Sequence, residues 1–322
     1  ELYYTMQDID KAIYYLTLSA NQNNPQALYN LGLICYNNKD INEAIRLFEL
    51  ASKQNEPKAQ YTLGNIYFEG KYVNKNINKA IQYFKLAADH NHMKAQNSLA
   101  IFYIENKYIK RDINKAIYYL ELASNQNDPC AQYNLGLIYY DKQYNKIDIN
   151  KAIQYFTLAA EQNHPDAQYN LGIFFYEGIY ITRDIDKSIY YFNLASNQNV
   201  LEAQYNLGLI YYEGKYKTQD INKSIYYFNL AAKQNLAEAQ NKLGIIYLEG
   251  KYIPKDINEA INYFTLASYN GHAQAQCSLG NIYYDGTNIK PDINKAIYYF
   301  TLSANQNYAK AQLCLGEIYY EG

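Results

Sequence analysis

The sequence predicts an all-α protein, a solenoid of about nine antiparallel helical hairpins, on two observations. The phrase AQYNLGLIYY returns along the chain in close variants, and variants of DINKAIYYFTLAA follow it about ten residues later. One small residue in the first phrase recurs every 36 residues, after a single first step of 32. Its positions are Gly32, Gly64, Ala100, Gly136, Gly172, Gly208, Gly244, Gly280 and Gly316. A fixed period of this length is typical of stacked helical units, because each unit buries its apolar face against its neighbours.

Each repeat is expected to begin with a helix, which we call helix A. Around Gly172 it covers about residues 166–177, and its apolar positions have the spacing i, i+4, i+7 and i+8 of one helical face. They are Ala167, Leu171, Phe174 and Phe175. Pro165 stands at the first helical position, where a missing N–H costs nothing. Gly178 is expected to end the helix. Glycine recurs at this place in Gly70, Gly214, Gly250 and Gly286.

The second helix of each repeat, helix B, is expected to begin at an aspartate. In the same repeat this residue is Asp184, whose carboxylate can accept hydrogen bonds from the first-turn amides. The apolar face of this helix is Ile185, Ile189, Phe192 and Ala195. The equivalent aspartates are Asp40, Asp112, Asp148, Asp220, Asp256 and Asp292. Glu43 and Glu259 follow two of them at the spacing of a capping box. A turn of about three residues follows, so helix B folds back on the next helix A.

The recurring small residue predicts a close crossing of two helices. The position holds glycine or, once, Ala100, and nothing larger. A bulky side chain there would push the helices apart, so Gly172→Leu is expected to destabilise the fold. Because one repeat already carries alanine, Gly172→Ala is expected to be mild.

We interpret residues 1–322 as a single solenoid that starts and ends with half a repeat. A length of 322 residues usually suggests two domains, but a solenoid lengthens by adding units. The first half repeat is a helix B at about 8–21, and the last is a helix A at about 310–321. Leu315, Ile318 and Tyr319 are expected to face the place where a further helix B would pack. Such an exposed apolar patch favours one of two alternatives: the protein continues beyond Gly322, or the chain associates end to end.

Composition argues against several classes of function. The 29 basic and 31 acidic residues are nearly balanced, which argues against nucleic acid as a partner. No apolar run approaches the roughly 18 residues that span a bilayer, so no membrane partner is expected. No secretory signal is visible, and a cytoplasmic location is favoured. The four cysteines do not follow the repeat, so they are expected to be thiols in a reducing compartment. They are Cys35, Cys130, Cys277 and Cys314.

The repeat resembles the Sel-one-like repeat family, relatives of the tetratricopeptide repeat with a longer turn inside the hairpin. The shared pattern is an alanine, Leu-Gly, a tyrosine, a terminal glycine, and then an Asp-led helix with Lys-Ala, Tyr-Phe and Ala-Ala. It covers essentially the whole chain. The resemblance implies a right-handed superhelix that acts as a scaffold or adaptor for other proteins. Some departures occur: the first A–B turn, 37–40, is four residues shorter than the others, and Asn106 and Lys142 replace the terminal glycine.

No catalytic, cofactor-binding or metal-binding residues are predicted. His92, His164 and His272 share one repeat position just before helix A, with His90 close by. Metal ligands must converge in space, whereas these side chains are spread over separate repeats. Other repeats hold Asn24, Glu56, Asp128 and Val200 at the same position. We therefore interpret the histidines as solvated turn residues.

The candidate site is a surface on the A helices. In tetratricopeptide-type solenoids the concave face comes from helix A, and the resemblance transfers that register to two aromatic rows. Three residues before the glycine stand Tyr61, Tyr133, Tyr169 and Tyr205. Four residues after it stand Phe68, Tyr140, Tyr176, Tyr212, Tyr284 and Tyr320. Next to the second row lie Glu69, Asp141, Glu177, Glu213, Glu249, Asp285 and Glu321. Positions seven apart share one helical face. Either these tyrosines line a binding groove, or they only fill the contacts between neighbouring A helices.

The function that the sequence favours is a non-enzymatic scaffold that binds a peptide or partner protein in this groove. The alternative is a repeat-type RNA-binding protein, which needs a basic surface that the charge balance does not indicate. A hydrolase activity is associated with a cysteine-rich subgroup of the family, in which each repeat carries a cysteine pair. This chain lacks those pairs, so that inference does not transfer.

Overall fold

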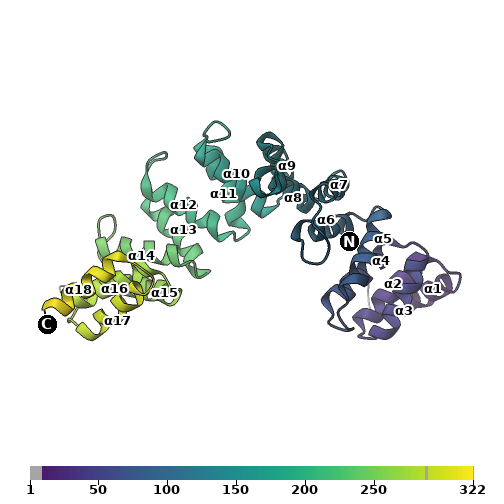
Figure 1. Ribbon diagram of the computed structural model, residues 1–322, viewed down its shortest axis with the longest axis horizontal. Helices are drawn as coiled ribbons and strands as arrows, with labels where there is room; N and C mark the ends of the chain where they lie inside the picture. The colour runs from purple at the N-terminus through teal and green to yellow at the C-terminus, as the bar shows by residue number, and fades with distance from the viewer. Residues whose placement is uncertain (1–8, 287–288, 322) are drawn as a thin grey trace. The chain divides into compact units, whose positions relative to one another are not determined.

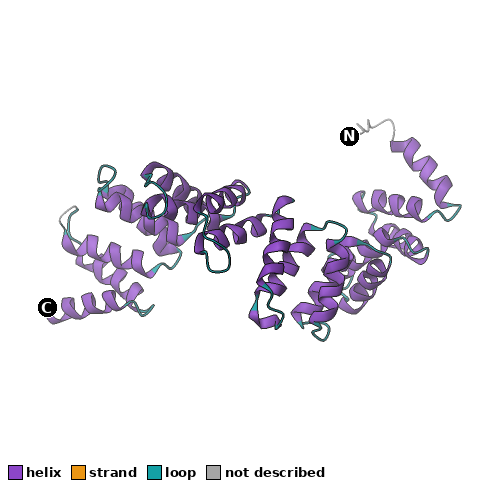
Figure 2. Cartoon of the chain, turned by 90° about the horizontal axis from the view of Figure 1, so that it is seen from above, coloured by secondary structure: helices purple, strands orange, loops and turns teal. Residues whose placement is uncertain are grey.

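The computed structural model describes residues 9–286 and 289–321, and within these ranges it is helical throughout, with no strand (Figures 1 and 2). The α-helices found there are α1 (Ile9–Ala20), α2 (Pro25–Asn37), α3 (Ile41–Lys53), α4 (Pro57–Glu69), α5 (Ile77–Asp89), α6 (Met93–Glu105), α7 (Ile113–Ser124), α8 (Pro129–Tyr140), α9 (Ile149–Glu161), α10 (Pro165–Glu177), α11 (Ile185–Asn197), α12 (Leu201–Glu213), α13 (Ile221–Lys233), α14 (Ala237–Glu249), α15 (Ile257–Tyr269), α16 (Ala273–Asp285), α17 (Ile293–Ala304) and α18 (Ala309–Glu321). One 3₁₀ turn, η2 (Lys142–Tyr144), follows α8. Among these helices none has the length and apolar character that a bilayer crossing requires.

The chain divides into two compact units, one ending at Ala167 and the other starting at Gln168. Inside each unit the even-numbered helices are A helices, and each packs against the following odd-numbered B helix as a hairpin. Within each unit the B helices also pack against the next helix A, from α1 on α2 to α7 on α8 and from α11 on α12 to α17 on α18. These contacts confirm the predicted solenoid-like stacking of hairpins. That the whole chain forms one continuous body stays a prediction.

The helix boundaries confirm the capping residues that the sequence predicts. Asp184 accepts a hydrogen bond from the Lys187 amide at 3.0 Å, and the other six aspartates of this position cap their helices in the same way. Gly214 ends α12 in the left-handed region at φ +64°. Asn106 replaces this glycine at φ +56°, which asparagine tolerates better than most residues.

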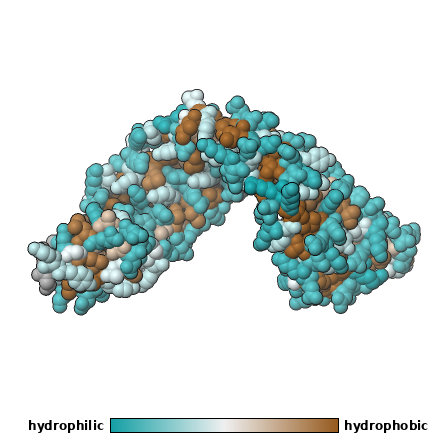
Figure 3. Space-filling model, in the orientation of Figure 1, coloured by the Kyte–Doolittle hydropathy of each residue, from teal (hydrophilic) through white to brown (hydrophobic). Residues whose placement is uncertain are grey.

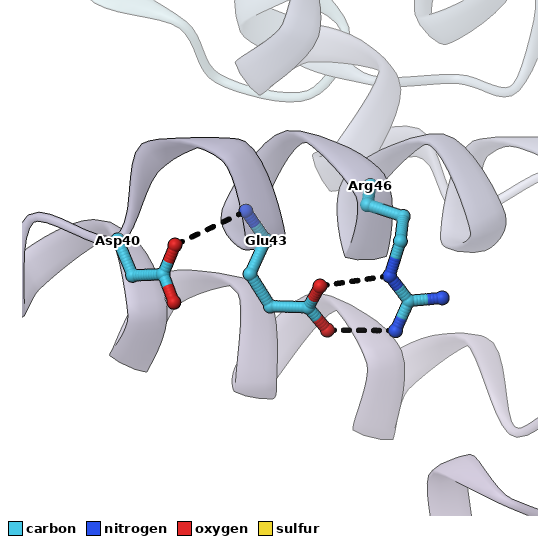
Figure 4. Close-up of polar contacts among 3 residues, drawn as sticks. All are labelled: Asp40, Glu43 and Arg46. Atoms are coloured by element: carbon cyan, nitrogen blue, oxygen red, sulfur yellow. Dashed lines mark hydrogen bonds and ion pairs between the residues drawn. The ribbon is translucent and has the colours of Figure 1, made fainter.

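Only half of the capping box at Asp40 forms (Figure 4). The Asp40 carboxylate accepts from the Glu43 amide at 3.3 Å. The Glu43 carboxylate does not return to Asp40. It accepts two hydrogen bonds from Arg46 instead, at 2.8 Å from Nε and 2.6 Å from Nη2. A bidentate guanidinium binds a carboxylate more strongly than a single amide does, which accounts for the preference.

The glycine of helix A lies directly under a phenylalanine ring of helix B. A Cβ built on Gly208 would stand 2.5 Å from the ring of Phe228, far inside van der Waals contact. The other helical glycines from Gly32 to Gly280 meet the same ring position, at Phe48, Phe84, Phe156, Phe192, Phe264 and Phe300. All seven rings are buried. Glycine inside a helix costs about 1 kcal/mol relative to alanine, so the close ring contact outweighs that cost.

The repeat that carries Ala100 in place of glycine also differs at the helix B position that contacts the glycine in other repeats. Where the small residue is Ala100, the position that otherwise holds phenylalanine holds Leu120. Both side chains are fully buried, on the paired helices α6 and α7. The expectation that Gly172→Ala is mild is therefore wrong, because its Cβ would stand 2.5 Å from the ring of Phe192.

Buried glutamines join three successive helices. Gln204 of α12 donates through Nε2 to the Ser196 carbonyl of α11 at 3.3 Å, and its Oε1 accepts from the Gln234 side chain after α13 at 2.9 Å. Five equivalent pairs lie at 2.7–3.0 Å: Gln126–Gln96, Gln162–Gln132, Gln198–Gln168, Asn270–Gln240 and Gln306–Gln276. The first member of each of these five pairs was expected only to be part of the turn after helix B.

The side chains that the last helix, α18, exposes are not all those that the sequence predicts. Leu315 and Ile318 are half-buried against the cluster around Phe300. The exposed apolar side chains are Leu313, Tyr319 and Tyr320. Apart from Gly316 itself, its two neighbours in sequence and the backbone of its own helix, no described atom lies within 4 Å of the place where a Cβ of Gly316 would stand. Asp8, the expected start of the first helix, lies outside the described residues.

We predict that the small residue and the ring position are coupled. Gly208→Ala should destabilise the protein by about 1–3 kcal/mol through overpacking, and Gly208→Leu by more. Adding Phe228→Leu to Gly208→Ala recreates the Ala100–Leu120 pair and should recover part of the loss, with a coupling energy of about 0.5–3 kcal/mol. Chemical denaturation of the two single variants and the double variant measures this. Strictly additive losses would contradict the contact.

Candidate functional site

The first aromatic row of the predicted groove is half-buried. Tyr61, Tyr133, Tyr169 and Tyr205 each pack on the core phenylalanine of their own hairpin, with ring centroids 5.6–5.9 Å apart. Burial raises the pKa of Tyr169 and Tyr205. These four side chains therefore take part in packing against helix B of their own hairpin, whereas the second interpretation of the sequence placed them between neighbouring A helices, and only part of each ring is accessible.

The second aromatic row is more accessible. Tyr140 and Tyr284 are exposed, at 39% and 45% of their surface. Phe68, Tyr176 and Tyr212 are half-buried. Rings from the next repeat cover them edge-on: Tyr176 meets Tyr216 at 6.0 Å, and Tyr212 meets Tyr252 at 6.3 Å. Tyr320 is exposed, and the Glu321 side chain lies outside the described residues.

The sequence analysis missed the tyrosines of the A–B turns. Tyr72, Tyr180, Tyr216 and Tyr252 stand two residues after the terminal glycine, and each is exposed by more than a third. Arg183 holds one of them in place. Its guanidinium lies 4.9 Å over the Tyr216 ring and donates to the Tyr176 and Glu177 carbonyls at 3.0 and 2.8 Å. The signal that could have found them is the recurring Gly-X-Tyr sequence.

Two small cavities lie between neighbouring A helices at the same repeat positions. One, of about 180 Å³, lies between α4 and α6 and is lined by Phe68, Phe84 and Phe102, with Glu105 at its edge. The other, of about 170 Å³, is formed by α16, α17 and α18 and is lined by Tyr284, Phe300 and Ile318, with Glu317 at its edge. We call these cavities the notches. An apolar cavity of about 150 Å³ is large enough for benzene, so each notch has room for one apolar side chain.

The acidic row lies next to the second aromatic row, at the carboxyl ends of the A helices. Glu69, Glu177, Glu213 and Glu249 are exposed, and each is the last residue of its helix. A negative charge there opposes the helix dipole. In the described part of the chain none of these four carboxylates is in an ion pair. They are therefore accessible to a cationic group from outside.

The B helices carry a different row of tyrosines. Tyr118, Tyr190, Tyr226 and Tyr298 are each exposed by 57–58% and make a T-shaped contact only with the following tyrosine. The tyrosine that follows each of them in sequence stacks in parallel on a ring of helix A. Tyr227, for example, stacks on Tyr211 with ring centroids 6.0 Å apart. Hydrophobic residues reach the surface as separate patches between hydrophilic ones (Figure 3).

Comparison with known proteins gives the family. The Sel1 repeat matches residues 57–92, 94–128, 131–164, 165–200, 201–236, 237–272 and 273–308. The chain belongs to the Sel1 repeat family. A tetratricopeptide repeat matches residues 1–58. Sel1 repeats commonly form scaffolds for protein–protein interaction, and the resemblance that the sequence suggested is confirmed.

Two solved structures support the same assignment. A protective antigen present in uropathogenic Escherichia coli strains, which displays an SLR fold, is 27% identical with a TM-score of 0.89, over 96% of this chain and 67% of that one. A Sel1 repeat protein from Oxalobacter formigenes is 28% identical with a TM-score of 0.74, over 95% of this chain and 89% of that one. The search of curated proteins finds no match.

The histidines of these Sel1 repeats are helix caps rather than solvated turn residues. Nδ1 of His92, His164 and His272 accepts from a first-turn amide of helix A at 3.2–3.4 Å. All three are half-buried. His92 and His164 also stack on Tyr61 and Tyr133, with centroids 4.6 and 4.5 Å apart. Among the described residues, no group of three or more His, Cys, Asp or Glu side chains could hold a metal ion.

These caps predict that stability falls in mild acid. Burial lowers the pKa of His92, His164 and His272 below the ordinary histidine value of about 6.5. A lowered folded-state pKa means that the unfolded chain binds the proton more readily. The three neutral histidines therefore contribute their full stabilisation above about pH 6.5. This stabilisation is lost as the pH falls through their folded-state pKa values.

A triple variant tests this. Asparagine already caps α2 through Asn24, which accepts from the Ala27 amide at 3.1 Å and does not titrate. His92→Asn, His164→Asn and His272→Asn together should keep the caps and reduce the drop in melting temperature between pH 7.5 and pH 5. Circular dichroism melts of parent and variant at both pH values measure the difference. An equal drop in both proteins would contradict the prediction.

Proposed function

We propose that this Sel1 repeat protein is a non-enzymatic scaffold that binds a basic, extended peptide segment of a partner protein along its A-helix face. The single observation that carries the proposal is the pair of notches between neighbouring A helices. Each notch takes one wall residue from the second aromatic row, Phe68 or Tyr284, and both stand at the same repeat positions, so each of the two units offers a pocket for an apolar side chain of a bound peptide. Tyrosine and phenylalanine supply large contact areas at low entropic cost.

The acidic row supports a basic ligand. Four carboxylates end A helices against the helix dipole, where lysine or arginine would stabilise the helix instead. No ion pair in the described chain offsets that cost at Glu69, Glu177, Glu213 or Glu249. A peptide that presents lysine or arginine beside an apolar residue would satisfy the carboxylates and fill the notches together. Such pairing mainly raises the association rate and the specificity.

The RNA-binding alternative is weaker. A net charge of −2 and an acidic row beside the aromatic rings both repel a phosphate backbone. The aromatic rows could stack on bases, but single-strand binding needs a positively charged groove along them as well.

We predict that peptide binding depends on the exposed members of the second row. Peptides selected from a random display library on the parent protein should be rich in lysine or arginine next to aromatic or aliphatic residues. The combination of Tyr140→Ala and Tyr284→Ala should weaken binding of a selected synthetic peptide at least tenfold, and rising salt should weaken it further. Fluorescence anisotropy gives both quantities.

The matched control removes two tyrosines of the B helices that are more exposed than the tested pair. Tyr190→Ala with Tyr298→Ala deletes the same atoms from the other face and should leave peptide affinity unchanged. A second variant, Glu69→Gln with Glu177→Gln and Glu213→Gln, should lose the salt dependence while the fold persists. Equal losses in the two tyrosine pairs, or selected peptides without basic residues, would refute the proposal.

We also propose end-to-end self-association of this chain. The exposed Leu313 and Tyr319 on α18, and the open space beside Gly316, match what a further helix B would cover. The first helix, α1, is itself a helix B, and Leu16 stands at its ring position. Sedimentation at rising protein concentration should show association that Leu313→Glu abolishes. A monomer at all concentrations would contradict it.

A further inference from the structure

A larger cavity, of about 310 Å³, lies away from the notches, between α5, α6 and the turn that leads into α7. Its floor is apolar. Ile81 contributes from α5, Leu99 and Tyr103 from α6, and Ile109 from the turn. The volume falls at the lower end of the range for small-molecule pockets, which is enough for one ring and its substituent. We call this space the α5–α7 cavity.

Basic side chains surround this floor. Lys85, Lys110, Arg111 and Lys115 line the cavity, against one lining carboxylate, Asp112. Four positive charges less one negative charge leave three positive charges. Lys85, Lys110 and Arg111 are exposed, so they can reorient toward a ligand. This local excess of positive charge contrasts with the net charge of the whole chain, which is −2.

The lining carboxylate is already engaged. Asp112 caps α7 by accepting from the Lys115 amide at 3.0 Å, and its other oxygen lies 3.8 Å from Lys115 Nζ. Arg111 lies over the Tyr144 ring at 5.2 Å, a contact that leaves its charge uncompensated by any carboxylate. Within the described ranges neither Lys85 nor Lys110 is in an ion pair.

The first hairpin provides a comparison inside the same chain. It has a cavity at the equivalent place, of about 500 Å³, lined by residues of α1, α2 and α3. There Thr17 stands for Lys85, Cys35 for Tyr103, and Glu43 for Lys115. Glu43 is neutralised by Arg46 (Figure 4). The shorter turn has no counterpart of Lys110, and Lys39, which precedes Asp40 as Arg111 precedes Asp112, does not line the cavity. A cavity at this place is therefore shared by both repeats, whereas the excess of positive charge is found in the α5–α7 cavity.

We propose that the α5–α7 cavity binds a phosphate monoester carried on an aromatic group. Three uncompensated positive charges suit a dianion better than a single carboxylate, and lysines bind phosphate as point charges. The aromatic body lies on the apolar floor beside Tyr103. The amino end of α7 adds positive potential at the same place. Two sources share this chemistry, a free aryl phosphate and a phosphotyrosine side chain of a partner protein. The site is separate from the A-helix face, and the proposal does not depend on the proposed function.

Calorimetry with phenyl phosphate tests the site directly. Binding should be at least tenfold tighter than that of inorganic phosphate, and phenol should not bind. Lys85→Gln with Lys110→Gln and Arg111→Gln should abolish binding. The single variant Lys85→Glu should weaken it at least fivefold without unfolding, because α3 and α7 carry Glu49 and Glu121 at the same position.

The matched control removes three exposed cations elsewhere. Lys146→Gln with Lys233→Gln and Lys255→Gln changes the net charge equally and should leave phenyl phosphate binding intact. A phosphotyrosine peptide that binds more tightly than phenyl phosphate identifies a protein partner, and the reverse identifies a small molecule. Equal losses in both triple variants, or inorganic phosphate binding as tightly as phenyl phosphate, would overturn the proposal. So would a single-stranded RNA that binds through these cations while phenyl phosphate does not.

Discussion

The contact between a helical glycine and a phenylalanine ring sets the geometry of every hairpin that contains it. Because Gly208 has no Cβ, the ring of Phe228 lies against its backbone, and α12 and α13 approach more closely than side chains otherwise allow. That approach fixes the rotation of helix A about its own axis. Residues three before and four after the glycine must then share one face, so the aromatic rows follow from the core and not from local surface preferences.

The glutamine pairs fix the order in which hairpins stack. Gln204 reaches back to the carbonyl of Ser196 on the preceding helix B and accepts from Gln234 at the end of its own. A buried amide that loses a partner costs about 1–3 kcal/mol, so a helix that slips by one residue leaves several such groups unsatisfied. Apolar contacts between alanines would tolerate a slip far better. The glutamine pairs thus fix the register of neighbouring helices, while burial of apolar side chains supplies most of the stabilisation of the core.

The parts of the structure that the sequence predicted are those that one repeat specifies alone. Apolar spacing, the Asp184 cap and the Gly178 stop act within one or two turns, so the helices and their order followed from pattern. The errors concern contacts between positions 20 to 35 residues apart. Ala100 could be explained only once Leu120 was seen as its partner, and His92 became a cap stacked on Tyr61 rather than a solvated side chain. Such pairings depend on how closely the helices pack, which a periodic pattern leaves open.

Function in a repeat protein then depends on where one copy departs from the others. The stacking that makes a hollow beside α5 also makes one in the first hairpin, and the two differ in the length of the A–B turn and in the side chains at equivalent positions. In the first, Glu43 and Arg46 cancel each other. In the second, Lys85 and Lys110 stand without partners around an apolar floor. Like charges at the mouth of an apolar hollow repel one another. This repulsion does not stabilise the fold. Binding of an anion in the hollow is the simplest physical explanation for placing these positive charges there.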